Sequence, residues 1–121
     1  MIVKTYRLYT GEDGHSYVEQ GTLLPDLKVP VETLHYKISP PGSVSSLHNA
    51  PATNYVITLL GEVEFETSRG HKFMVKPGDL LMAEDIHGLG HSWKILGTDP
   101  WVRYYVVYPA NQGHVCGFTK Q

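Results

Sequence analysis

The sequence has a single cysteine, no long apolar run and almost no excess of charge. One cysteine, Cys116, cannot form a disulfide within the chain, so we expect a protein of the reducing cytoplasm. No apolar run reaches the ~18 residues of a membrane-spanning helix. A formal net charge of −2 argues against a nucleic-acid partner, which would require a basic surface.

Turn-forming and strand-forming residues are abundant instead. The 121 residues include 12 Gly, 8 Pro and 8 Tyr, and 41% of them are hydrophobic, enough for one core. No stretch has the apolar period of an amphipathic helix. The composition therefore predicts one all-β domain over residues 1–121, with many short strands and turns.

Short alternating segments between Gly, Pro and Asp residues are predicted to be strands. Segment 54–60 is apolar on both faces, which is typical of a central strand, and Gly61 permits a bend after it. The expected strands are residues 2–9, 16–19, 31–39, 54–60, 62–66, 72–75, 80–83, 91–96 and 102–108.

Two segments resemble the motifs of the cupin family. The first reads Gly42-x5-His48-x-Ala50-x3-Asn54-x6-Gly61, where the family ordinarily has G-x5-H-x-H-x3-E-x6-G. The second opens with Lys76-Pro77-Gly78-Asp79 and has His91 at its histidine position. The resemblance covers roughly residues 31–108. It implies a cupin barrel (a double-stranded β-helix, or jelly roll) of two antiparallel sheets around one pocket, and a homodimer.

The resemblance also implies a metal site, but this sequence differs from the family at two of the ligand positions. Family members hold a metal with three histidines and a carboxylate, but Ala50 and Asn54 replace the second histidine and the glutamate. The remaining set is His48, Asn54 and His91, which we expect inside the barrel. A divalent transition metal (Fe, Mn, Ni, Cu or Zn) is the cofactor that such N and O ligands suit. The segment 84–90 adds two carboxylates and His87, which could lean towards the site.

The alternation within segment 31–39 provides a further candidate. Leu34, Tyr36 and Ile38 share one face, which we expect to turn inward, whereas His35 lies on the opposite, polar face and is expected to be solvated. The candidate catalytic residues are therefore His48, His91, Asn54 and Tyr36. Trp93 has the parity of His91 and is expected to line the pocket. The roles of His35 and His87 stay open.

These observations favour an enzyme that acts on a small organic substrate in the barrel. Its chemistry is metal-assisted or rests on histidine acid–base catalysis, of the isomerase, cyclase, lyase or dioxygenase type. The alternative is a non-catalytic module that binds a small ligand, which the loss of two metal ligands favours. We also expect a homodimer that pairs through a free strand edge in residues 2–9.

Overall fold

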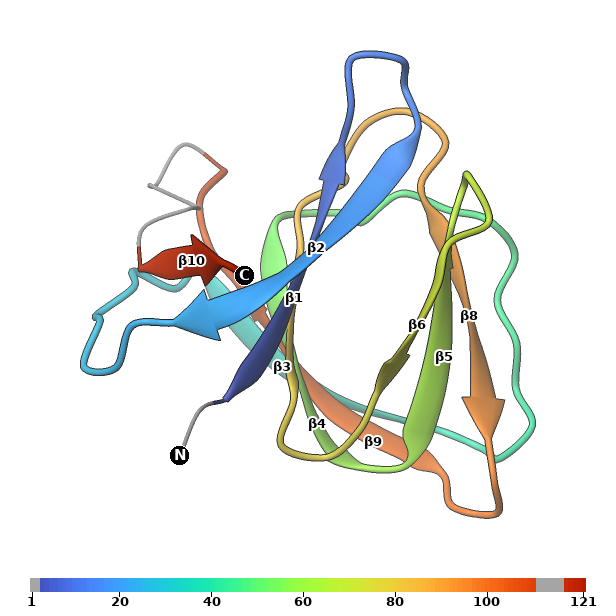
Figure 1. The fold of residues 1–121 in the computed structure, drawn as a ribbon. Helices are drawn as coiled ribbons and strands as arrows, with labels where there is room; N and C mark the ends of the chain where they lie inside the picture. Colours follow the sequence, from blue (N-terminus) through green and yellow to red (C-terminus); the bar gives the residue numbers. More distant parts are fainter. Residues whose placement is uncertain (1–2, 111–116) are drawn as a thin grey trace.

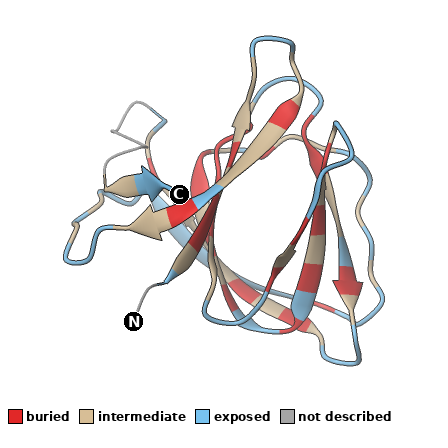
Figure 2. Cartoon of the chain, in the orientation of Figure 1, coloured by how far each residue is buried: buried red, intermediate tan, exposed pale blue. Residues whose placement is uncertain are grey.

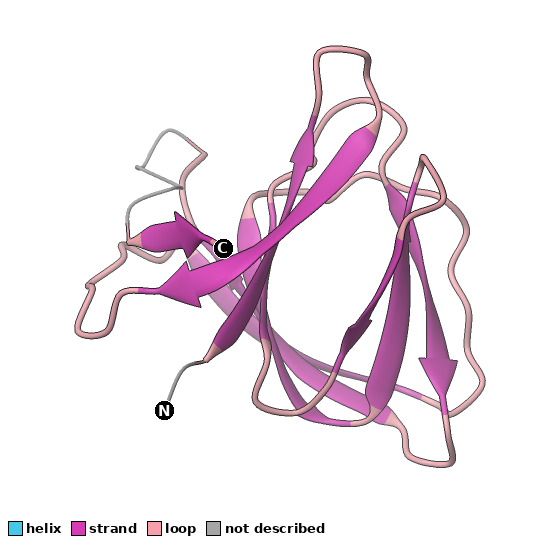
Figure 3. Ribbon diagram, viewed as in Figure 1, coloured by secondary structure: helices cyan, strands magenta, loops and turns pink. Residues whose placement is uncertain are grey.

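The computed structural model describes residues 3–110 and 117–121, and all regular elements within these ranges are β-strands (Figures 1 and 3). The predicted all-β class is confirmed. Within the described ranges, no helix is long and apolar enough to cross a membrane. Cys116, on which the expected compartment rests, lies outside the described residues. The strands are β1 Lys4–Thr10, β2 Ser16–Leu23, β3 Thr33–Ser39, β4 Asn54–Leu60, β5 Glu62–Thr67, β6 Lys72–Val75, β7 Leu80–Ala83, β8 His91–Leu96, β9 Trp101–Val107 and β10 Phe118–Lys120.

The strands form two sheets that face one another around a common interior (Figure 1). The larger sheet has the order β10-β2-β1-β7-β4-β9-β3, and the smaller has the order β6-β5-β8. The predicted barrel of two sheets is confirmed. The expectation that both sheets are purely antiparallel is wrong, because β1 runs parallel to β7 from Thr5↔Leu80 to Leu8↔Ala83. A long connection separates these two strands in the sequence, as a parallel pair requires.

Gly61 lies where the chain passes from the larger sheet to the smaller one, between β4 and β5. Its φ of 97° is accessible to glycine and rarely to other residues. A Cβ at this position would lie 2.6 Å from the carbonyl oxygen of Pro100. The register of β4 against β9 also shifts just before it, between Thr58 and Leu60. The bend that the sequence predicts at Gly61 is therefore confirmed.

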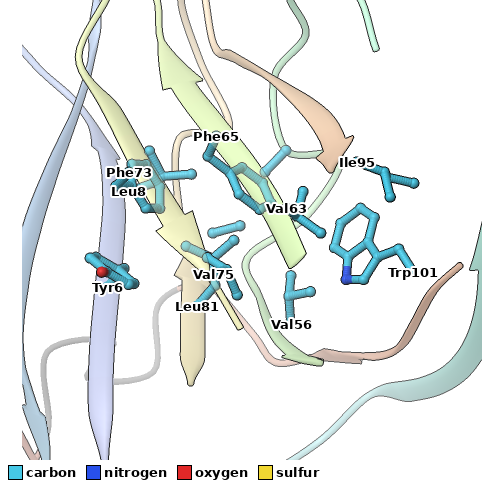
Figure 4. Close-up of a cluster of buried hydrophobic side chains, with 12 residues drawn as sticks. Tyr6, Leu8, Val56, Val63, Phe65, Phe73, Val75, Leu81, Ile95 and Trp101 are labelled. Atoms are coloured by element: carbon cyan, nitrogen blue, oxygen red, sulfur yellow. The ribbon is translucent and has the colours of Figure 1, made fainter. Parts of the chain in front are cut away.

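The core lies between the sheets and consists mainly of buried apolar side chains from β1 and from β4 to β9 (Figures 2 and 4). From the smaller sheet, Val63, Phe65 and Val75 are buried, and the glutamates between them face outward. From the larger sheet, Leu8 and Leu81 meet them across the interior. This alternation is the reason that the segment 62–66 reads as a half-exposed strand in the sequence.

The inward face of β3 is the opposite of the one predicted. Tyr36 is 53% exposed, and Leu34 and Ile38 beside it are similarly exposed on the outer face. His35 and Lys37, although exposed, are the residues of this strand that line the cavity. The alternation is predicted correctly, but the inner face of this edge strand borders the cavity with His35 and Lys37 and not the packed core, so apolar residues are not required there. The assignment of Tyr36 to the pocket is wrong.

The first strand also lies elsewhere than expected. β1 is paired along its length with β2 and, from Thr5 to Leu8, also with β7, so these four residues offer no free edge. The outer strands of the larger sheet are β3 and β10. The homodimer stays a prediction, but it cannot form by strand pairing along residues 5–8.

Candidate functional site

A cavity of about 290 Å³ lies between the two sheets. Strands β3, β4, β7 and β9 of the larger sheet and β5 and β8 of the smaller sheet contribute to its wall, together with residues 45–51. Its size suits a small organic molecule. The lining side chains are His35, Lys37, Ser45, His48, Ala50, Pro51, Asn54, Val56, Phe65, Leu81, Ala83, His91, Trp93, Trp101, Arg103 and Tyr105.

His91, the first residue of β8, is paired with a buried carboxylate. Its Nδ1 lies 2.6 Å from Oδ2 of Asp85, which is fully buried, and His91 itself is 5% exposed. An Nδ1–H that donates to this carboxylate leaves Nε2 as the ring nitrogen that can meet a ligand. The other carboxylate oxygen, Oδ1 of Asp85, is buried without a hydrogen-bond partner. The pair holds the His91 ring in one orientation and one tautomer.

His48 lies directly beside His91, as the sequence predicts. The two residues form an antiparallel bridge, in which each backbone N–H donates to the other's carbonyl at 2.8 Å. Their ring centroids are 4.7 Å apart. Nδ1 of His48 lies 2.8 Å from the carbonyl oxygen of Ser46. Because a carbonyl oxygen only accepts, this Nδ1 carries the proton and Nε2 is again the free nitrogen.

Gly90 permits this close approach of the two histidine segments. A Cβ at position 90 would lie 2.0 Å from the carbonyl oxygen of His48, and the residue has a φ of 79°. Any other side chain would push the two segments apart. The bridge between His48 and His91 therefore depends on glycine at this position.

Asn54, the first residue of β4, offers an uncommitted oxygen. Its Nδ2 donates to the carbonyl of Ala52 at 2.6 Å, which fixes the orientation of the amide. Its Oδ1 is buried and has no hydrogen-bond partner. Buried acceptors of this kind are rare, and they indicate a place for a water or a bound group. Asn54 also lines the cavity, as expected.

The donor atoms around the cavity are of the types that bind a divalent metal ion. They comprise two imidazole Nε2 atoms and one amide oxygen, and both imidazoles have Nδ1 anchored by an acceptor, as metal-ligating histidines almost always do. The set is short of negative charge: no group of three or more His, Cys, Asp and Glu side chains with metal-binding geometry exists in residues 3–110 and 117–121. Any such ion would be held more weakly than by a complete set.

The polar residues of the segment 84–87 face different parts of the molecule. Asp85 leans towards the site, as the sequence allows, but Glu84 turns away and binds Arg7 and Tyr108. His87 is exposed and faces a separate shallow pocket beside Arg7. Trp93 lines the cavity, and its prediction is confirmed. His35 is exposed, as expected, but it also lines the cavity and stacks on Tyr105 with ring centroids 4.9 Å apart.

Sequence reasoning missed Arg103. It lies in the middle of β9, is fully buried and lines the cavity between Trp101 and Tyr105. One signal was available: Arg103 is the only charged residue of the otherwise apolar or aromatic strand Trp101–Val107. A lone arginine on the inward parity of a buried strand predicts a polar site.

The fold and this pocket define the class: the chain has the double-stranded β-helix fold of the cupin type. An uncharacterized conserved protein with a double-stranded β-helix domain from Klebsiella pneumoniae superimposes with a TM-score of 0.54 at 22% identity, over 83% of this chain and 81% of that one. A candidate ethanolamine utilization protein Q from Salmonella typhimurium has a TM-score of 0.51 at 13% identity, over 92% of this chain and 99% of that one. No family model and no curated protein matches the sequence.

Proposed function

We propose that the chain is an enzyme of the isomerase or lyase type, which moves a proton on a small organic molecule held in the cavity. The observation that carries this proposal is the buried contact between His91 and Asp85. A carboxylate behind a histidine is the arrangement by which a general base is oriented and its protonated form stabilised. Nothing in the packing of a barrel requires two buried polar side chains to be held so closely.

The residues supply the parts of a proton transfer next to a carbonyl group. Nε2 of His91 accepts the proton, and Asp85 stabilises the imidazolium that forms. The His91 imidazolium returns this proton to a neighbouring atom of the same substrate, and the ring of His48, whose centroid is 4.7 Å away, can accept a hydrogen bond from the substrate at its free Nε2. The aromatic side chains of Phe65, Trp93 and Trp101 line the cavity and exclude water from the reacting atoms.

A divalent metal held by His48, His91 and Asn54 would supply Lewis-acid chemistry at the same place and, with open positions, dioxygen chemistry. Elemental analysis of protein purified without added metal distinguishes this version of the site from the metal-free one. If a metal is present, His48→Ala should remove it and leave the fold intact. Unchanged metal content in His48→Ala would place the ion elsewhere.

The rival function is a binding module that holds its ligand without turning it over. It is favoured by a specific observation: Ala50 and Asn54 stand at two ligand positions of the cupin motif, and both line the cavity. The module needs the cavity walls but has no use for an oriented base. The two functions therefore differ in what they predict for Asp85.

Asp85→Asn tests the proposal once a thermal-shift screen of metabolites has supplied a substrate. The amide keeps the shape of the carboxylate and removes its charge, so kcat should fall by about 10²-fold or more while KM changes little. The pH profile of kcat should also change, which a merely structural role would not cause. His71→Ala, at an exposed histidine outside the cavity, is the control and should keep full activity. Full activity in Asp85→Asn would contradict the proposal.

A further inference from the structure

Arg103 carries a buried charge that the described protein leaves partly uncompensated. Its Nε donates to the Tyr105 hydroxyl at 3.0 Å, and its Nη1 donates to Oγ of Ser39 at 2.8 Å and to the Trp101 carbonyl at 3.2 Å. The guanidinium also lies 3.7 Å from the centroid of the Trp101 ring. Its Nη2, however, is buried without a hydrogen-bond partner. None of the ion pairs within residues 3–110 and 117–121 includes Arg103.

A second cation faces the same cavity from the adjacent strand. Lys37 of β3 is the direct cross-strand partner of Arg103 on β9, and both residues line the cavity. Like charges in directly opposed positions of a sheet destabilise it. The protein alone gains nothing from this arrangement, but an anion between the two side chains would turn the repulsion into attraction.

The other residues that line the cavity also carry no negative charge. Besides Tyr105, the ionisable side chains around the cavity are Lys37, Arg103 and three histidines, and none of the described lining residues is an aspartate or glutamate. The chain as a whole has more acidic than basic residues, with 12 Asp and Glu against 10 Lys and Arg. The positive lining is therefore a local property of the cavity.

We propose that the cavity binds a small organic carboxylate, with its charged group held by Arg103 and Lys37. A planar carboxylate beside the guanidinium would accept from the buried, unpartnered Nη2, and the exposed Lys37 ammonium would close the site from the next strand. The hydrocarbon part would lie against Phe65 and Trp93, with its far end near His91. The inference rests on the proposed function for the identity of the site, and it names the class of molecule on which that site acts.

Matched pairs of a carboxylate and its amide test the charge requirement. We would measure the affinities of benzoate and benzamide, and of hexanoate and hexanamide, by calorimetry, with phenylphosphonate as a different anion. At least one carboxylate should bind about 10-fold or more tightly than its amide, because a hydrogen bond to a charged group in a buried site is stronger than a neutral one. In ¹⁵N spectra, the Arg103 guanidinium signals should shift with the carboxylate and not with the amide. The carboxylate assignment is overturned if no carboxylate is preferred over its amide, or if phenylphosphonate alone binds.

Lys37→Glu tests the same idea without any ligand. The new carboxylate would face Arg103 and supply the missing counter-charge, so the melting temperature of the unliganded protein should rise by about 3 °C or more. The same variant should lose the preference for carboxylates. Lys28→Glu, with the same change of charge at an exposed position between β2 and β3, is the control and should alter neither. A lower melting temperature, or intact carboxylate binding in Lys37→Glu, would contradict the proposal.

These outcomes can be separated from a failure of the proposed reaction. If the chain is a binding module, the carboxylate preference stands while no substrate is turned over. If turnover depends on Asp85 but neutral amides bind as well as carboxylates, the reaction stands and the anion site is wrong.

Discussion

Two arginines of the larger sheet, the half-buried Arg7 and the fully buried Arg103, are bound in opposite ways. Arg7, on β1, donates to Oε1 of Glu84 and to Oε1 of Glu19, each at 2.8 Å. The second oxygen of Glu84 accepts from the Tyr108 hydroxyl, so this network is closed. Arg103, on β9, is more deeply buried, yet it has no carboxylate partner in the described chain and keeps one unpartnered nitrogen. The two sites hold the same side chain for different purposes.

The difference separates structural polar groups from functional ones. A buried network in which each charge has a partner fixes the positions of strands, and it leaves nothing for a ligand to bind. By contrast, three buried side-chain atoms of the described residues have no hydrogen-bond partner: Oδ1 of Asn54 and Nη2 of Arg103, on two residues that line the cavity, and Oδ1 of Asp85, which contacts the lining residue His91. Natural proteins tolerate such atoms mainly where a ligand or a reaction uses them.

The largest effect on stability should come from breaking the closed network. Arg7→Met strands the buried Glu84 carboxylate and should lower the free energy of unfolding by about 3–5 kcal/mol. Arg103→Met removes hydrogen bonds but also removes a charge that has no counter-charge, so its loss should be about 1–2 kcal/mol. Urea unfolding of both variants measures this contrast. A larger loss for Arg103→Met than for Arg7→Met would contradict the comparison.

A smaller loss is expected at the edge of the same network. Tyr108→Phe removes the hydroxyl that donates to Glu84 and leaves a buried carboxylate oxygen without its partner, which costs about 1–3 kcal/mol. Tyr36→Phe, at an exposed tyrosine, should change the free energy of unfolding by less than about 0.5 kcal/mol. Equal losses in the two variants would show that the Tyr108 contact contributes nothing.

Tyr108 also predicts a pH dependence. Burial, together with the hydrogen bond to Glu84, raises the pKa of Tyr108 well above its usual range. The folded state therefore keeps a proton that the unfolded state loses above its pKa of about 10. Its contribution to stability is fully present below pH ~10 and is lost as the pH rises further, by up to about 1.4 kcal/mol per pH unit. This decline should be shallower in Tyr108→Phe when unfolding is followed from pH 9 to 11.

Substitutions on the outer face of β3 should have the smallest effect on stability. This face is exposed and apolar, and we expect the homodimer to form through it. Leu34, Tyr36 and Ile38 are exposed there, on an outer strand of the larger sheet. Ile38→Lys should give a monomer at micromolar concentration in a sedimentation experiment, where the unchanged chain gives a dimer. A dimer that survives Ile38→Lys would place the contact on another surface.

Much of the fold follows from local patterns. Period-two alternation and turn residues predict the seven strands from β3 to β9 nearly residue for residue, and the motif spacing brings His48 and His91 together. The face of a strand is harder to predict. In β3 the apolar residues lie outside because the strand is at the edge of a sheet and its inner side borders the cavity and not the packed core. The strands that pair with β3 decide which of its faces turns inward, and they are distant from it in the sequence.

The sequence predicts only part of the site, because contacts with residues distant in sequence decide which side chains point into it. The motif identifies His48, Asn54 and His91, all of which line the cavity. Asp85 was only one of two carboxylates that could lean inward, and the parity of the loop does not choose between it and Glu84. Its selection depends on Arg7 and Tyr108, which bind Glu84 from distant strands. Tyr36 was assigned to the pocket because an apolar face usually turns inward.

The most direct test of a proton-transferring site is chemical recovery of a bound compound. A metabolite that stabilises the protein in a thermal-shift screen is incubated with the unchanged chain and with His91→Ala, and both mixtures are analysed by mass spectrometry and NMR. In deuterated water, the unchanged chain should return an isomerised, cleaved or deuterated compound, and His91→Ala should do so about 10²-fold more slowly. A compound that binds the unchanged chain and is recovered without any change, deuterium included, would contradict the enzyme and leave a binding module.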